Sequence, residues 1–199
     1  MMNRNHIRTS LIGSLILASS AFTTAMAVPF DTLTVSEETQ LAAYEKVYIA
    51  PVSVNLTEDT RRNIRDINSE RPVTPQDQAR RADKFQKYLA RDFGKRFEIV
   101  EAPADDVLVI EATITQLAST RPTLADANVN VQLDFSRSIY AGSASYSVNL
   151  QAGDLVLAEI ADSYDTTLND GRPRIAIWQD ADAGLSLFSR QLARYVAKN

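Results

Sequence analysis

Cysteine is absent from the 199-residue chain, so no disulfide can constrain what it folds into. A domain of about this length buries roughly 70% of the surface that its unfolded chain exposes, which is enough to fold without cross-links. The burial of apolar side chains must then hold the structure together. The spacing of apolar residues along the chain is therefore the main evidence for the fold.

The first 27 residues have the features of a secretory signal peptide. Arg4 and Arg8 make a basic start, residues 11–22 are largely apolar, and residues 25–27 (Ala-Met-Ala) have the small-x-small pattern that signal peptidase cleaves. The apolar stretch is shorter than the roughly 20 residues that span a bilayer, which argues against a membrane helix. We expect export, to the periplasm or the medium, with cleavage after Ala27.

Cleavage would leave a mature chain that begins at Val28, and no cysteine there could accept a lipid anchor. No second apolar run approaches the length that spans a bilayer. We therefore expect neither a transmembrane helix nor a lipid anchor in the mature protein. The predicted organisation is a signal peptide over residues 1–27, a polar lead-in over 28–44 and a single α/β domain over 45–199.

Cleavage also removes His6, the only histidine of the chain. Without histidine and cysteine, the mature chain cannot build Ser-His or Cys-His nucleophile pairs or the usual zinc sites. Neither a G-x-S-x-G motif nor a glycine-rich phosphate loop is present. These exclusions predict a protein that is not an enzyme and that uses no cofactor.

The charge of the mature chain argues against two classes of partner. Removing Arg4 and Arg8 from 21 basic residues leaves 19 against 25 acidic ones, a net charge of −6. Proteins that bind the phosphate backbone of nucleic acids are usually basic, so no nucleic-acid partner is expected. The same sign argues weakly against adsorption to anionic lipid.

Two long helices are predicted from apolar residues at helical spacing. Thr74 and Pro75 are typical of the N-cap and first turn of a helix, and Gly94 is expected to end that helix in a left-handed conformation. The second helix is predicted from about residue 178 to 198, and Gly184 within it indicates a close approach to a strand. The apolar stripes are Ala82, Phe85, Leu89 and Phe93, and Trp178, Ala181, Leu185, Phe188, Leu192 and Tyr195. The basic residues Arg80, Arg81, Lys84, Lys87 and Arg91 lie largely outside the first stripe.

Alternating apolar residues predict the strands. Apolar residues on both faces of the first strand indicate a central strand covered on at least most of both sides, and Pro51 within it should mark a bulge or the end of pairing. The predicted strands are residues 46–54, 97–100, 107–117, 143–151 and 155–164.

The order of these elements predicts the architecture. A crossover through the first helix should place two strands parallel, and the later strands should form an antiparallel meander. We predict an α/β fold of the α+β type. It is a two-layer sandwich with a mixed five- to six-stranded sheet and two long helices mainly on one face.

Residues 118–142 form a connection of a length that is uncommon in compact domains and is often functional. Alternation within it indicates a strand over residues 128–136, which could either extend the sheet edge of a partner or pack on the domain's own sheet. We hypothesise that this segment or another sheet edge binds a protein partner of the cell envelope. The candidate interaction residues are Val129, Val131, Leu133 and Phe135.

Aspartates gather in sequence near the last loop and the start of the second helix. As hard oxygen ligands they could hold calcium, and two of them could act as general acid and base in a hydrolase. Turns and helix caps use aspartate for local reasons, and the spacing of an EF-hand is absent. A carboxylate-dependent hydrolase or a calcium-dependent binder is therefore the alternative hypothesis. The residues concerned are Asp162, Asp165, Asp170, Asp180 and Asp182.

Several segments resemble a bacterial family of exported proteins known as domain-of-unknown-function family 3313. The matching segments are YEKVYIAPV at 44–52, the Thr-Pro-x-Asp helix start at 74–77, ADDVL at 104–108, LVLAE at 155–159 followed by Asp162, and WQDA at 178–181. The resemblance implies an envelope protein and no known reaction. Many members look like lipoproteins, whereas this chain has no cysteine at the expected cleavage site.

Overall fold

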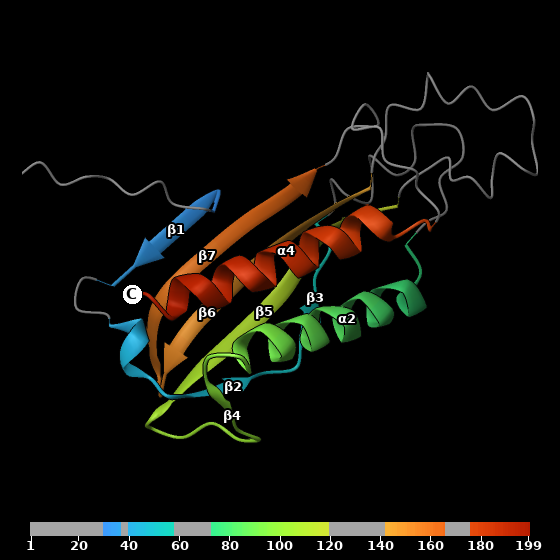
Figure 1. Cartoon of the computed structure of the whole chain (residues 1–199). Helices are drawn as coiled ribbons and strands as arrows, with labels where there is room; N and C mark the ends of the chain where they lie inside the picture. Colours follow the sequence, from blue (N-terminus) through green and yellow to red (C-terminus); the bar gives the residue numbers. More distant parts are fainter. Residues whose placement is uncertain (1–29, 37–39, 58–72, 120–141, 166–175) are drawn as a thin grey trace, which may run out of the picture.

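The computed structural model describes residues 30–36, 40–57, 73–119, 142–165 and 176–199. Within them, seven strands form one sheet, and two long helices lie side by side on one of its faces (Figure 1). The strand order is β1-β7-β6-β5-β2-β4, and β3 also pairs with β5. This confirms the predicted two-layer α+β sandwich, with one strand more than the larger predicted sheet.

The bounds of the elements agree closely with the sequence patterns from residue 46 onward. The predicted strand at 128–136 lies outside the described residues. The strands are β1 (Thr32–Val35), β2 (Lys46–Ile49), β3 (Ser53–Val54), β4 (Glu98–Ile99), β5 (Val107–Ala118), β6 (Ser143–Ala152) and β7 (Leu155–Asp165). The helices are α2 (Pro75–Phe93) and α4 (Gln179–Val196), with one 3-10 turn, η1 (Leu41–Ala43).

The pairing of the strands follows the predicted scheme. β2 is parallel to both β4 and β5, while β5, β6 and β7 form an antiparallel meander. Pairing through β2 ends at Ile49 and resumes in β3 at Ser53. Pro51 therefore lies at a break in the strand, because proline has no N–H to donate to a ladder.

β1 was not predicted, since its residues fall in the segment interpreted as a polar lead-in. It pairs antiparallel with β7, with Thr32 opposite Ala161 and Val35 opposite Ala158. β1 thus forms one edge of the sheet, and β4 forms the other (Figure 1).

The core lies between the helices and the sheet face that they cover. The aromatic ring of Phe188 on α4 is centred 4.2 Å from that of Tyr146 on β6 and 6.1 Å from that of Phe85 on α2. One continuous cluster of buried residues therefore includes most of both helical stripes and the inward strand residues. Its members include Ile49, Phe85, Leu89, Phe93, Ile110, Val148, Trp178, Leu185, Phe188 and Leu192.

Three local predictions need correction. β2 is fully buried on one face only, because Val47 and Ile49 are buried while Tyr48 on the opposite face is half-buried. Gly94 ends α2 in a right-handed conformation, with φ −61°, rather than a left-handed one. Arg81 is buried, although the helical stripe places it outside the core.

The predicted close approach of the second helix to a strand at Gly184 is confirmed. A Cβ added at this residue would lie 2.6 Å from the Cβ of Tyr164 on β7. The absence of a side chain thus allows α4 to approach the sheet at this point. Across the described ranges, no helix is both long and apolar enough to cross a membrane.

Candidate functional site

The predicted aspartates are distributed over two elements. Asp162 and Asp165 lie in β7, and Asp180 and Asp182 lie in the first turn of α4, whereas Asp170 is outside the described residues. Among the residues that the structure describes, no three acidic, histidine or cysteine side chains are placed to hold a metal ion.

Asp182 takes part in a link between the first turns of the two helices. It accepts hydrogen bonds from Arg81 Nη1 and Lys84 Nζ, both at 2.6 Å. The guanidinium of Arg81 lies over the Trp178 ring, 5.6 Å from its centroid. Trp178 Nε1 in turn donates to Asp77 at 3.3 Å. These contacts fix α2 against α4, so Asp182 and Trp178 have structural roles here.

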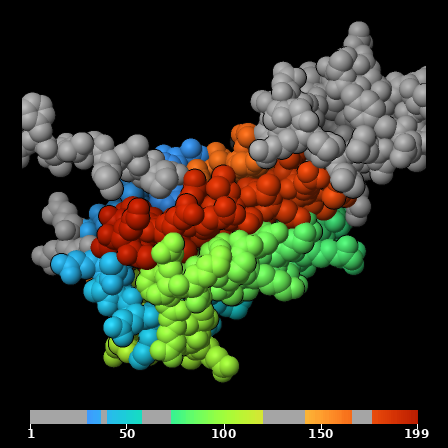
Figure 2. Space-filling model, viewed as in Figure 1, coloured from blue at the N-terminus to red at the C-terminus, as the bar shows by residue number. Residues whose placement is uncertain are grey.

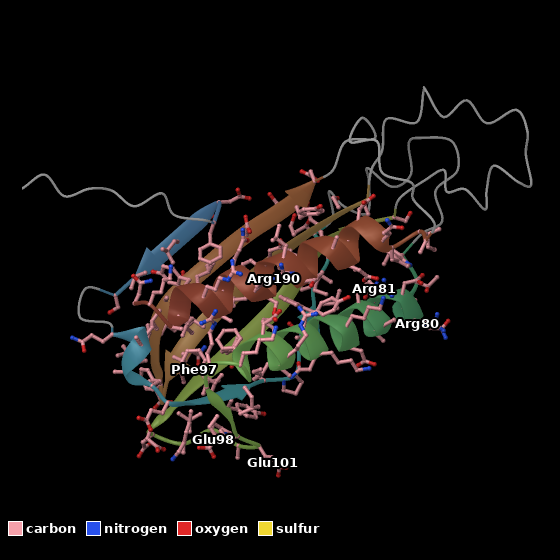
Figure 3. The ribbon with its side chains drawn as sticks, in the orientation of Figure 1. Arg80, Arg81, Phe97, Glu98, Glu101 and Arg190 are labelled. Carbon is pink, nitrogen blue, oxygen red and sulfur yellow. The ribbon has the colours of Figure 1, made fainter. Side chains whose placement is uncertain are left out.

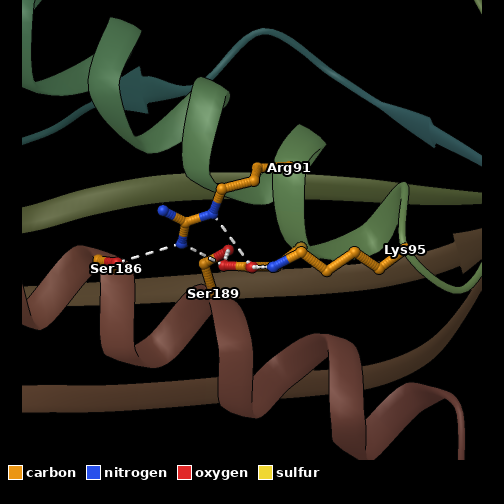
Figure 4. Close-up of polar contacts among 5 residues, drawn as sticks. Arg91, Lys95, Ser186 and Ser189 are labelled. Carbon is orange, nitrogen blue, oxygen red and sulfur yellow. Dashed lines mark hydrogen bonds and ion pairs between the residues drawn. The ribbon is translucent and has the colours of Figure 1, made fainter.

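A second link joins the later turns of the helices around Asp92 (Figure 4). This buried carboxylate accepts hydrogen bonds from Arg91 Nε at 3.1 Å, Lys95 Nζ at 2.7 Å and Ser189 Oγ at 3.3 Å. Burial alone would raise the pKa of Asp92, but the hydrogen bonds and charges of Arg91 and Lys95 outweigh it and lower this pKa to about 2. The ionised form of Asp92 is therefore part of the fold.

Asp162 has the opposite perturbation. Burial raises the pKa of its carboxyl, and the neighbouring charge of Asp31 raises it further, against backbone hydrogen bonds from Ser163 and Asp31. Opposite Asp162 in the ladder is Tyr146, whose buried hydroxyl donates to the Gly184 carbonyl at 3.4 Å. A raised carboxyl pKa suits a general acid, but a perturbed pKa also arises in purely structural settings.

The face of the sheet opposite the helices carries mainly short polar side chains. Rows across the strands can be followed from the register: Glu111, Asn149 and Glu159 form one row. The next row contains Thr113, Ser147 and Ala161. No helix in the described part of the chain packs on this surface, which we call the open sheet face.

The two edges of the sheet differ in how accessible they are for pairing. β1 is four residues of β-branched and apolar type, and Val35 is 38% exposed. β4 has only two residues, and the charged Glu101 and then Pro103 follow it shortly. Short length, charge and proline are features that protect an edge from pairing, so β4 is the protected edge and β1 the open one.

The candidate interaction residues Val129, Val131, Leu133 and Phe135 lie outside the described residues. The flanks of their segment are described, because Ala118 of β5 pairs with Ser143 of β6. The two described flanks of this segment therefore meet at one end of the sheet.

The described residues form a two-layer α+β sandwich in which no described helix covers one sheet face and β1 is an edge strand. The chain belongs to the family described as "Protein of unknown function (DUF3313)", whose model matches residues 29–192. This confirms the resemblance found in the sequence. No curated protein is similar in sequence to this chain.

Solved structures show distant similarity. The PelC dodecamer from Paraburkholderia phytofirmans is 10% identical, covers 80% of this chain and 97% of that one, and has a TM-score of 0.43. A hypothetical protein from Chlamydia trachomatis is 12% identical, with coverage of 79% and 100% and a TM-score of 0.47. A DUF330 protein from Xanthomonas campestris is 12% identical, with coverage of 83% and 90% and a TM-score of 0.49. At such low identities and TM-scores, these similarities support no conclusion about function.

Proposed function

We propose that this protein is an exported, non-catalytic binding protein of the cell envelope that holds an extended segment of a partner protein along β1. The observation that carries the proposal is the outer edge of this strand, with which no described strand pairs. Export is supported by the signal-peptide pattern of residues 1–27. A non-catalytic role is supported by the absence of histidine and cysteine from the expected mature chain.

The directions of the N–H and C=O groups in β1 follow from the last hydrogen bond between β1 and β7. Ser36 N–H donates to the Leu157 carbonyl at 2.9 Å, one residue beyond the Val35–Ala158 pair. In an antiparallel ladder, residues that exchange hydrogen bonds alternate with residues that do not. The N–H and C=O groups of Leu33 and Val35 therefore point away from β7, toward the outer edge.

These outward groups are what an added strand requires. In β-augmentation, an extended peptide forms main-chain hydrogen bonds to an exposed edge, and alternate side chains supply specificity. Leu33 and Val35 lie on the same face as the core residues Ile160 and Ala158. An apolar side chain of the partner could extend the core over this edge.

A proline at position 35 tests the proposal, because it removes one outward N–H without removing a bond to β7. The preceding residue is already extended, as proline requires. We expect Val35→Pro to lose a partner that wild type captures from a periplasmic extract, while its melting temperature stays nearly unchanged. The mature protein used for capture should begin at Val28 by N-terminal sequencing.

Val35→Thr is the matched control, because it keeps the N–H and the β-branched shape. It should capture the same partner as wild type. Equal capture by Val35→Pro and Val35→Thr would show that the β1 edge is not the binding surface.

A further inference from the structure

Charge is divided between the two layers of the molecule. The helices and their flanking residues, 73–96 and 176–199, contain ten basic and five acidic residues. The remaining described residues, which form the sheet and its turns, contain one basic and eleven acidic residues. Within the described residues, the helix layer and the sheet layer therefore carry opposite net charge.

The positive charge lies on the outward side of the helices. On α2, Arg80, Lys84, Lys87 and Arg91 follow one another at steps of four, three and four residues, which is one face of a helix. Figure 2 shows α2 and α4 as one continuous surface, and Figure 3 shows Arg80 projecting from it. On α4, Arg190, Arg194 and Lys198 recur every four residues.

Much of this charge is not neutralised within the described residues. Lys84 is paired with Asp182, and Arg91 and Lys95 are paired with Asp92. The other exposed cations of α2 and α4, and Lys198 just beyond α4, make no ion pair with any described residue. We call these the basic helix face: Arg80, Lys87, Arg190, Arg194 and Lys198.

The open sheet face has the complementary charge. Glu111 and Glu159 are exposed and lie in one row, on either side of Asn149. Lys46, the only cation of the described sheet layer, is bonded to Asp106 at 2.7 Å and so does not neutralise them. The neighbouring row has short side chains, which leaves room for long lysine and arginine side chains to lie on the sheet.

The spacing of the charges on the open sheet face is similar to the spacing on the basic helix face. Glu111 and Glu159 are two strands apart, which is about 10 Å across a sheet. Helices packed side by side have axes about 8–10 Å apart, so cations on α2 and on α4 repeat at a similar interval. Leu187, which is 39% exposed, lies on α4 near these cations and adds an apolar contact.

We infer that the basic helix face of one copy docks on the open sheet face of a second copy of this chain. The helices of one molecule then cover the open sheet face of the other. Because two different surfaces meet, the contact is heterologous and repeats to give a ring or a filament rather than a symmetric dimer. Neither surface includes the outer edge of β1, so Val35→Pro should assemble like wild type.

Two charge-reversed variants test this inference by sedimentation velocity at low ionic strength. One carries Lys87→Glu with Arg190→Glu, and the other carries Glu111→Lys with Glu159→Lys. Wild type should sediment as a species larger than a dimer, and added salt should dissociate it, because exposed charges are screened. Each variant alone should be monomeric, since the reversed side chains then face side chains of their own sign on the other docking surface.

An equimolar mixture of the two variants should restore assembly. In an alternating arrangement, each contact again joins a basic surface to an acidic one. The control variant carries Glu101→Lys with Asp105→Lys in the exposed turn before β5. It changes the net charge by as much as Glu111→Lys with Glu159→Lys does, but away from the open sheet face. It should therefore assemble like wild type. Thermal melting checks that every variant is folded.

Three results would overturn the inference. Wild type could stay monomeric or stop at a dimer at low salt. Either variant could assemble alone, or the mixture of the two variants could stay monomeric. Binding of a monomeric wild type to anionic phospholipid vesicles would assign the basic helix face to a lipid surface instead.

Discussion

Asp92 shows how single buried charges connect the two helices. Its partner Ser189 is 97 residues away in sequence, and the partner of Arg81, Asp182, is 101 residues away. Helical periodicity describes only one helix at a time, so it could not show that these residues face one another. The packing of Trp178 and the close approach at Gly184 could be predicted from the sequence, because a large aromatic residue and a glycine in mid-helix have few structural roles.

We expect Asp92→Asn to destabilise the protein by about 2 kcal/mol at neutral pH, because the exposed Arg91 and Lys95 lose their anion and the buried Ser189 hydroxyl loses a charged acceptor. Urea denaturation measures this loss. Asp83→Asn, at an exposed position of the same helix, is the control and should change stability by less than about 0.5 kcal/mol.

The effect of Asp92 should depend on pH in a definite direction. The pKa of this group is lowered from an ordinary 3.8 to about 2 in the folded protein. A lowered pKa means that the stabilisation is complete above about pH 4 and is lost as the pH falls toward 2. The difference in stability between wild type and Asp92→Asn should shrink over that range. A difference that stays constant from pH 7 to pH 2.5 would contradict this account of the pKa.

At the scale of elements, α2 was predictable because its signals are local. The Thr74 side chain accepts from the Asp77 N–H at 3.1 Å, which confirms the N-cap expected at Thr74. β1 was not predictable, because its four residues are too few for a clear alternation. Its position is determined by β7, more than 120 residues later in the chain.

Gly184→Ala distinguishes helix propensity from packing. Propensity alone predicts that alanine stabilises a mid-helix position by about 1 kcal/mol. The structure predicts the opposite sign, a loss of about 1–3 kcal/mol, because the new Cβ would lie 2.6 Å from Tyr164 Cβ. Thermal or urea denaturation decides between them. Ala183→Gly, at the exposed neighbouring position, should lose about 1 kcal/mol through propensity alone.

For the whole molecule, net charge was a poor guide to surface chemistry. A value of −6 for the expected mature chain argues against anionic partners, yet the described basic residues are concentrated on one layer. Net charge sums over all surfaces, and only the fold shows how α2 and α4 bring their cations together. The proposed roles of Val129, Val131, Leu133 and Phe135 stay a prediction, because these residues lie outside the described ranges.

The two edges of the sheet offer a direct test of where the partner binds. Val35 on β1 and Ile99 on β4 are 38% and 40% exposed, so a photo-crosslinking amino acid is equally accessible at either position. With the partner in a periplasmic extract, we expect a crosslinked product from position 35 and none of the same mass from position 99. The same product from both positions, or from position 99 alone, would contradict binding along β1.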